Sequence, residues 1–327
     1  MTLKTQATRL ILAVPVALFL GVAPGAALAQ DSTVTATVAA QPERPAIYDE
    51  SADAGQQIAA ALTKAKKENR RVLIQWGANW CSWCHLLHET FQKNGDVRKK
   101  LLYEYDVVLV DIGQGDKNLD LARKYGADFK KAGVPFLTIL DDEGNVLANQ
   151  ETSSLEKKID GKDGHDPAKV NEFLTKHQAS YPYAAAVLNE AMSEAARTNR
   201  KVFVHFGAPW CGWCHRLEDW LARPEIAQIV EKDFVELKID TDRMIGGAEL
   251  LLGYRESSRG GIPWFAFLTP EGKKVVTSDG PQGNVGCPYS DEEIDAFGAM
   301  LRQARRSITD DEIATLLQSL RDGREKK

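Results

Sequence analysis

Cysteine is scarce in this sequence, with five in 327 residues. Four of them stand in two C-x-x-C pairs, Cys81/Cys84 and Cys211/Cys214, and the fifth is Cys287. A disulfide-stapled scaffold would scatter more cysteines through a smaller chain. The scarcity therefore excludes that class, and the spacing indicates a chemical role for the paired cysteines.

Long apolar runs and basic runs are also scarce. The one apolar run of note, Leu10–Ala23, holds about 14 residues, whereas a membrane-spanning helix needs about 20. No Lys/Arg-rich run with interleaved aromatics occurs, and the formal net charge is -5, which argues against a nucleic-acid partner. The composition, 43% hydrophobic and 27% charged, is typical of a globular protein, and the length suggests about two domains.

The N-terminal segment has the pattern of a secretory signal. Lys4 and Arg9 precede the apolar run, and Ala27-Leu28-Ala29 is an A-x-A-type cleavage site. The pattern predicts a signal peptide over residues 1–29, cut before Gln30, rather than an uncleaved anchor. It predicts a periplasmic or otherwise extracytoplasmic location, where disulfides persist. The small, polar and Pro-containing stretch that follows predicts a linker over residues 30–46.

The sequence contains an internal duplication. The segment RRVLIQWGANWCSWCH, residues 70–85, aligns with RKVFVHFGAPWCGWCH, residues 200–215. Downstream, Asp111 aligns with Asp240 and Tyr125 with Tyr254. The Gly-Val-Pro ending at Pro135 and the Gly-Ile-Pro ending at Pro263 align as well. Two long copies indicate a duplicated domain, since a solenoid would show at least three short repeats.

Each copy predicts the same order of elements. A helix, a strand, a Gly-Ala turn, the cysteine motif, a second helix, a strand, a helix, Gly-x-Pro, a strand, a turn and a final helix follow one another. The predicted elements are the helices 54–69, 167–177, 184–199 and 291–305 and the strands 71–76, 107–112, 136–140, 201–206, 234–239 and 265–268. This pattern predicts an α/β fold in which helices flank a mixed central sheet.

The predicted domains follow from the repeat. The first spans residues 47–179 and the second residues 180–306. Residues 307–327 are expected to form a C-terminal helix and tail, because Thr309 and Glu312 make a capping-box pattern before an apolar face.

The motif W-C-x-W-C, after a short strand and a Gly-Ala turn and followed some fifty residues later by x-Pro, resembles the thioredoxin superfamily. The resemblance covers both copies, from about residue 50 to 305, and is strongest to the tandem thioredoxin-like domains of exported thiol:disulfide interchange proteins. It implies a thiol–disulfide oxidoreductase that acts on protein disulfides or dithiols without a cofactor. Its partners would be protein thiol or disulfide substrates and another thiol redox protein, membrane-bound proteins included.

The chemistry of the motif assigns roles to the four cysteines. A strand that leads directly into a helix places Cys81 and Cys211 at helix N-termini, where unpaired N–H groups and the helix dipole favour a thiolate. These two are the predicted nucleophiles. Cys84 and Cys214 lie one turn further on and are the predicted resolving cysteines, which release the mixed disulfide.

The resemblance also implies residues that bind substrate. Pro135 and Pro263 match the family's cis-proline, whose neighbouring backbone pairs with an extended substrate. Trp80 and Trp210 are expected to pack beside the reactive sulfur and to exclude water; the alternative is that either is a plain core or rim aromatic.

One position departs from the family pattern. Thioredoxins usually hold a buried acid six residues before the first cysteine, and here those residues are Gln75 and His205. His205 is a candidate proton relay, because imidazole titrates near neutrality. The alternative is a hydrogen-bonded core histidine. The two domains are therefore expected to differ in the rate of thiol–disulfide exchange or in reduction potential.

Three rival interpretations remain open at the level of sequence. His85 and His215 follow the pairs, and C-x-x-C-H is also the attachment signature of c-type haem, although a haem domain needs neither the strand nor the proline. Zinc is disfavoured because His88, a possible ligand in the first copy, is replaced by Glu218 in the second; we predict no metal site. A non-catalytic binding or adaptor role is the third. The redox direction, whether reductase, oxidase or isomerase, is also open.

Overall fold

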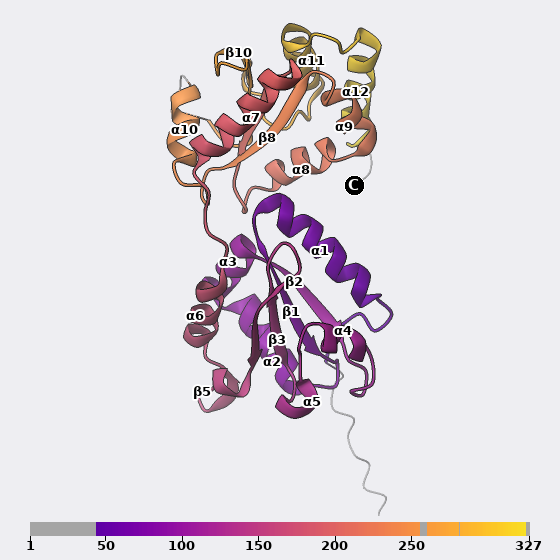
Figure 1. Cartoon of the computed structure of the whole chain (residues 1–327), viewed down its shortest axis with the longest axis vertical. Helices are drawn as coiled ribbons and strands as arrows, with labels where there is room; N and C mark the ends of the chain where they lie inside the picture. The colour runs from indigo at the N-terminus through magenta and orange to yellow at the C-terminus, as the bar shows by residue number, and fades with distance from the viewer. Residues whose placement is uncertain (1–43, 256–259, 281, 325–327) are drawn as a thin grey trace, which may run out of the picture. The chain divides into compact units, whose positions relative to one another are not determined.

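The computed structural model describes residues 44–255, 260–280 and 282–324 (Figure 1). The predicted signal peptide and the first part of the predicted linker lie outside this range. Across these residues, no helix combines the length and the apolar character that crossing a bilayer requires.

The first copy forms a four-stranded mixed sheet. Its strand order is β2-β1-β3-β4, in which β1 pairs parallel with β2 and antiparallel with β3, and β3 pairs antiparallel with β4. Its elements are α1 (Ala54–Glu68), β1 (Arg71–Gly77), α2 (Ser82–Lys93), α3 (Gly95–Glu104), β2 (Tyr105–Asp111), α4 (Leu119–Lys124), α5 (Phe129–Ala132), β3 (Phe136–Leu140), β4 (Val146–Glu151), a 3-10 turn (Ser153–Leu155), β5 (Glu156–Ile159), β6 (Lys162–His165) and α6 (Pro167–His177).

The second copy repeats this topology. The order β10-β9-β7-β8 has the same parallel and antiparallel neighbours. Its elements are α7 (Ala184–Thr198), β7 (Lys201–Gly207), α8 (Gly212–Leu221), α9 (Pro224–Val230), β8 (Phe234–Asp240), α10 (Gly247–Tyr254), β9 (Trp264–Leu268), β10 (Lys274–Thr277), β11 (Asp279–Gly280), β12 (Gly283–Asn284), α11 (Asp291–Ala304) and α12 (Asp310–Asp322). The predicted mixed α/β fold is therefore confirmed in both copies.

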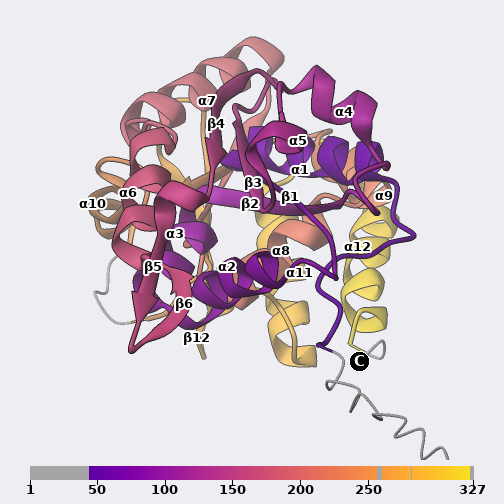
Figure 2. The same cartoon turned by 90° about the horizontal axis from the view of Figure 1, so that it is seen from below.

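Helices cover both faces of each sheet, and each face has its own core. In the first domain α1, α4 and α5 pack on one face, while α2, α3 and α6 pack on the other (Figure 2). In the second domain α7 and α10 cover one face, and α8, α9, α11 and α12 cover the other. The central strands β1, β3, β7 and β9 are almost wholly buried, as continuous apolar runs between two helical layers should be.

Short polar signals set the helix boundaries. Asn69 and Asn199 end α1 and α7 in the left-handed conformation, with φ of 51° and 53°, which asparagine tolerates better than most residues. The capping box predicted at Thr309 and Glu312 is present at the start of α12. The packing of α12 on the second domain buries its apolar face.

The structure adds elements that the sequence pattern did not predict. Where one helix was expected after each cysteine motif, two are present in each domain. Asn94 ends α2 and caps α3 by accepting a hydrogen bond from Val97 N at 3.1 Å, and Pro224 opens α9. The hairpin β5–β6 was also not predicted; it places His165 in the first domain's core.

Candidate active sites

Both cysteine motifs lie at a strand–turn–helix junction. Each first cysteine is the N-cap of its helix, α2 or α8, and its Sγ lies 3.1 Å from the backbone N of the second cysteine. Cys81 and Cys211 are therefore next to the unpaired N–H groups of a helix N-terminus, which stabilise a thiolate in the reduced protein.

Each pair forms a disulfide within one helical turn. Cys81–Cys84 and Cys211–Cys214 have Cα–Cα separations of 5.3 and 5.2 Å. The first cysteine of each pair is 4% exposed, and the second is almost completely buried. The first cysteine of each pair is therefore the more accessible one, and its role as the nucleophile stays a prediction.

Glycine ends the strand before each motif because the second cysteine packs against it. A Cβ at Gly77 would lie 2.6 Å from Cys84 Sγ and 2.3 Å from Tyr48 Oη. A Cβ at Gly207 would lie 3.2 Å from Cys214 Sγ. The Gly-Ala turn of the motif thus provides room for the resolving cysteine.

The two aligned prolines lie beside the reactive sulfurs. The Val134–Pro135 and Ile262–Pro263 peptides are cis. The carbonyl oxygens of Val134 and Ile262 lie 3.6 and 3.5 Å from Cys81 Sγ and Cys211 Sγ. The structure thus brings each predicted proline to its predicted nucleophile.

The tryptophans before the motifs lie at the rim of each site. Trp80 and Trp210 are 56% and 58% exposed, so neither is buried over the sulfur. Trp80 Nε1 donates to Gly113 O at 2.7 Å, and Trp210 Nε1 donates to Asp242 Oδ2 at 3.0 Å. Each indole is therefore held at one end and presents most of its surface to solvent.

A neutral pair lies behind the first site. Gln75 is fully buried, and its Nε2 donates to Tyr48 Oη at 2.6 Å and approaches Cys84 O at 3.4 Å. Burial raises the pKa of Tyr48, which keeps this hydroxyl protonated. Neither group is an ordinary proton acceptor near neutral pH.

Charged residues lie behind the second site instead. His205 is 1% exposed, and its Nε2 lies 2.8 Å from Glu236 Oε1, while its Nδ1 has no partner among the described residues. On α8, one turn after Cys214, Glu218 Oε2 accepts from Lys238 Nζ at 2.8 Å and lies 3.6 Å from His215 Nδ1.

These partners keep two carboxylates ionised, that of the buried Glu218 and that of the half-buried Glu236. Burial raises the pKa of Glu218, but the ion pair with His215 and the charge and hydrogen bond of Lys238 outweigh it and bring the pKa down to about 2. For Glu236, burial is likewise outweighed by His205, and the pKa is lowered. The same ion pair with Glu218 raises the pKa of His215. Charged side chains therefore lie behind the second site where the first has Gln75 and Tyr48.

The tryptophan between the two cysteines of each motif also has different neighbours in the two domains. Trp83 packs edge-on to the buried His165, at 5.5 Å between ring centroids. Trp213 is 47% exposed and packs edge-on to Tyr289 at 5.4 Å, and the Arg216 guanidinium lies over both rings. Trp213 and Tyr289 line a groove of about 590 Å³ that runs along Pro263.

Cys287 lines the same groove but is buried and unpaired. Burial raises the pKa of its thiol to about 11. It is therefore a protonated thiol at neutral pH and a poor nucleophile.

The motif histidines are engaged with the backbone. His85 Nε2 lies 2.8 Å from Asn79 O, and His215 Nε2 lies 2.8 Å from Pro209 O. Each imidazole thus uses Nε2 in a contact with the backbone, and the two cysteines within each pair are bonded to each other. Among the described residues, no group of three or more His, Cys, Asp or Glu side chains has the arrangement of a metal site.

Several residues of the sites were not predicted. Tyr48 precedes α1, far from the motif, and Glu236 and Lys238 lie on β8. Glu218 was noted only as a mismatch to His88, although its place one turn after Cys214 on the same helix face was a usable signal.

Comparison with known proteins follows the duplication. The model of the thioredoxin-like family matches residues 53–142 and 183–270. Protein disulfide-isomerase tigA of Aspergillus niger is 25% identical over 222 residues, covering 65% of this chain and 56% of the relative. Protein disulfide-isomerase erp38 of Neurospora crassa is 23% identical over 188 residues, 55% of this chain and 46% of the relative.

A solved structure described as disulphide isomerase from Xylella fastidiosa Temecula1 is 28% identical. The match covers 40% of this chain and 95% of the chain in that structure, with a TM-score of 0.33. The chain spans about half the length of the curated relatives it matches.

Proposed function

Because this chain belongs to the thioredoxin-like family, we propose that it is a thiol–disulfide oxidoreductase that acts on protein disulfides or dithiols through both cysteine pairs. One observation carries this proposal. In each domain the first cysteine caps a helix, lies within disulfide distance of a buried second cysteine and faces the carbonyl before a cis-proline.

The reaction needs only the four cysteines and a substrate disulfide. The thiolate of Cys81 or Cys211 attacks one substrate sulfur, forms a mixed disulfide and expels the other sulfur as a thiolate. The thiol of Cys84 or Cys214 then loses its proton and attacks the first cysteine. This step closes the intramolecular disulfide and releases the substrate dithiol. Two electrons pass from the protein to the substrate, and the reverse sequence oxidises a dithiol.

Substrate would bind along the proline and the exposed indole. Pro135 and Pro263 place backbone carbonyls within 3.6 Å of the reactive sulfurs, where an extended chain can pair with the backbone. Trp80 and Trp210 offer flat apolar surface at the same rim.

His205 is our candidate to accept the proton of Cys214. It lies on the strand behind the motif, is buried, and has Nδ1 without a partner among the described residues while Glu236 holds Nε2. A neighbouring carboxylate stabilises the imidazolium that proton transfer would form. In the first domain the neutral Gln75 cannot take this role, so the resolving step there would rely on solvent.

The location and partners are part of the proposal. The signal-like pattern of residues 1–29 supports a periplasmic or other extracytoplasmic location. In such a space the redox partner would be another thiol protein, and a membrane-bound one would connect this chain to reducing equivalents from the other side of the membrane.

The central test separates the two pairs. Turnover of insulin disulfides is measured for Cys81→Ala, Cys211→Ala and the double variant. We expect each single variant to keep the activity of one domain and the double variant to have none. Full activity in the double variant would refute the proposal. A redox titration of each pair with the other mutated then gives the direction, since reduction potentials of related proteins span roughly −270 to −120 mV.

A further inference from the structure

The loop after β8 connects the second cysteine site to the first domain, within one compact unit. Its backbone is fixed by Asp240, whose Oδ1 accepts from Asp242 N and from Arg243 N, both at 2.9 Å. Thr241 N donates to Gly207 O at 2.8 Å, which ties the loop to the end of β7 just before the cysteine motif.

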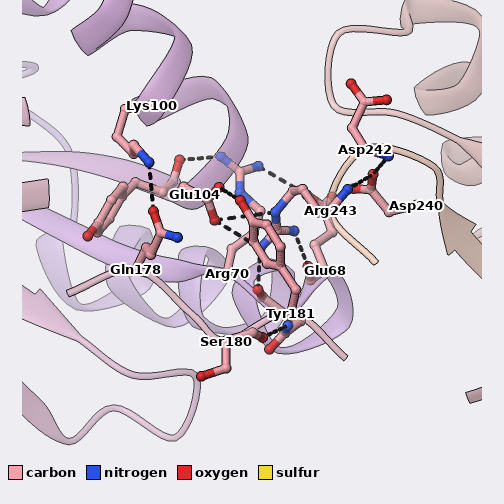
Figure 3. Close-up of polar contacts among 12 residues, drawn as sticks. Glu68, Arg70, Lys100, Glu104, Gln178, Ser180, Tyr181, Asp240, Asp242 and Arg243 are labelled. Carbon is pink, nitrogen blue, oxygen red and sulfur yellow. Dashed lines mark hydrogen bonds and ion pairs between the residues drawn. The ribbon is translucent and has the colours of Figure 1, made fainter. Parts of the chain in front are cut away.

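Arg243 anchors this loop in the first domain (Figure 3). Its guanidinium donates to Glu68 O at 2.8 Å and to Asn69 O at 2.6 Å, and it pairs with Glu104 Oε2 at 3.2 Å. Arg243 is 4% exposed and Glu104 1%, so the ion pair is fully enclosed. Tyr181, in the segment between the domains, donates to the other oxygen of Glu104 and packs beneath the guanidinium.

Asp242 connects this anchor to the reactive site. Its Oδ2 accepts from Trp210 Nε1 at 3.0 Å and from Tyr103 Oη at 2.9 Å. Tyr103 belongs to α3 of the first domain, and Trp210 directly precedes the nucleophile Cys211. One carboxylate oxygen therefore joins the indole beside the second nucleophile to a side chain of the other domain.

The first domain provides the contrast. Its equivalent indole, Trp80, donates to the backbone oxygen of Gly113 in its own domain. The duplicated sites therefore position the same tryptophan in two ways, one by a backbone carbonyl and one by a side chain that a second domain also holds.

We propose that the first domain positions Trp210 through Tyr103 and Asp242, and thereby sets how well the second site binds its protein substrate. This inference rests on the proposed function, in which Trp210 forms part of the substrate surface. Tyr103 and Asp242 are positioning residues, since they act through Trp210.

The physical basis is the exposure of the indole. Trp210 is 58% exposed, so packing alone holds it weakly and the hydrogen bond to Asp242 defines its orientation. Tyr103 in turn holds the carboxylate; burial and the hydrogen bond to Asp242 raise the pKa of Tyr103 to about 12, so the phenol remains a donor at any pH suitable for an assay. Without Asp242 the indole is a platform that substrate must order on binding. Without Tyr103 the carboxylate that holds the indole keeps, among the described residues, only Thr241 Oγ1, at 3.3 Å from Oδ1, as a further side-chain partner.

The test uses the full chain with Cys81→Ser and Cys84→Ser, so that only the second pair can react. In this background Tyr103→Phe and Asp242→Ala should raise KM for insulin disulfides roughly two- to ten-fold, the range that one hydrogen bond supplies, and change kcat little. Asp242→Asn keeps an oxygen that can accept from both donors, so its KM should stay near that of the background protein.

The matched control is Tyr103→Phe with Cys211→Ser and Cys214→Ser, where only the first pair reacts and KM should not change. A second readout does not depend on turnover. In protein labelled with 5-fluorotryptophan, Tyr103→Phe should shift the ¹⁹F resonance of Trp210 and leave that of Trp80 in place, each assigned with a Trp→Phe variant.

The outcomes separate the inference from the proposed function. An unchanged KM together with an unmoved Trp210 resonance would overturn the inference while activity persists. An equal rise of KM in both backgrounds would also overturn it, because it would indicate general destabilisation. Absence of turnover with only Cys211 and Cys214 present would refute the proposed function of the second site, and the resonance of Trp210 would still decide the inference.

Discussion

Arg243→Ala is expected to destabilise the chain more than any ordinary surface change, because it leaves a buried carboxylate without its cation. Glu104 is 1% exposed, and Arg243 supplies its ion pair at 3.2 Å. Removal of one partner of a buried pair typically costs about 3–5 kcal/mol. Tyr181 still donates to Glu104 in the variant, so we expect the lower end, about 3 kcal/mol.

The measurement is chemical unfolding of the full chain followed by far-UV circular dichroism and by tryptophan fluorescence. Two domains need not unfold in one step, so both probes are fitted and the transition that moves is identified. Arg123→Ala is the control. It removes a salt bridge with Asp120 whose side chains are 73% and 92% exposed, and such pairs contribute about 0–1 kcal/mol.

A second variant tests the stated cause. Glu104→Gln removes the buried charge, so Arg243→Ala combined with Glu104→Gln should be more stable than Arg243→Ala alone. If Arg243→Ala costs less than about 1 kcal/mol, or if the double variant recovers nothing, the buried-charge reasoning is wrong.

Three further predictions concern packing and pH. Gly77→Ala should destabilise more than Gly207→Ala in thermal unfolding, since its Cβ would lie 2.3 Å from the buried Tyr48 Oη; equal losses would contradict this. Burial lowers the pKa of His165 to about 4, so the unfolded chain binds a proton that the folded chain does not, and stability should fall by about 3 kcal/mol as pH drops from about 6.5 to 4. His165→Leu should abolish that slope in urea titrations. Glu218, with a pKa of about 2, contributes stability above pH 4.5 that is lost as pH falls towards 2, and Glu218→Gln should flatten that acid limb.

The sequence was informative wherever a local rule decides the structure. The helix ends at Asn69 and Asn199, the capping box at Thr309 and the strand–turn–helix at each cysteine motif all depend on residues within a few positions of one another. The duplication strengthened the predictions around the cysteine motif, because two separate segments of the sequence support the same order of elements.

The surroundings of the cysteines depend on tertiary packing and were not predictable in the same way. Tyr48 reaches Gln75 from 27 residues away, and Tyr103 reaches Asp242 from 139 residues away. Contacts of that range depend on which helix faces lie together, and hydrophobic periodicity leaves this undetermined. His205 was identified as unusual from the sequence, but its partner Glu236 lies on a neighbouring strand.

The polar differences between the two sites form one set. On the strand beside the central one, Val107 and Leu109 of the first domain occupy the positions of Glu236 and Lys238 in the second. These positions alternate along the strand, so both side chains point to the same face. Behind the cysteines, Gln75 is replaced by the histidine that Glu236 pairs with.

The charged members of that set lie in pairs that stabilise one another. A glutamate beside Gln75, or a lysine without Glu218, would leave a partly buried charge without its partner, which is unfavourable, since the side chains of Glu236 and Lys238 are only 29% and 15% exposed. The charged residues that distinguish the second site therefore occur as interacting pairs, while the geometry of the cysteine pair is the same in both domains. The cysteine motif thus determines which disulfide bonds can form and break in each domain. The two sites differ in the charged pairs His205–Glu236 and Glu218–Lys238, which only the second domain has.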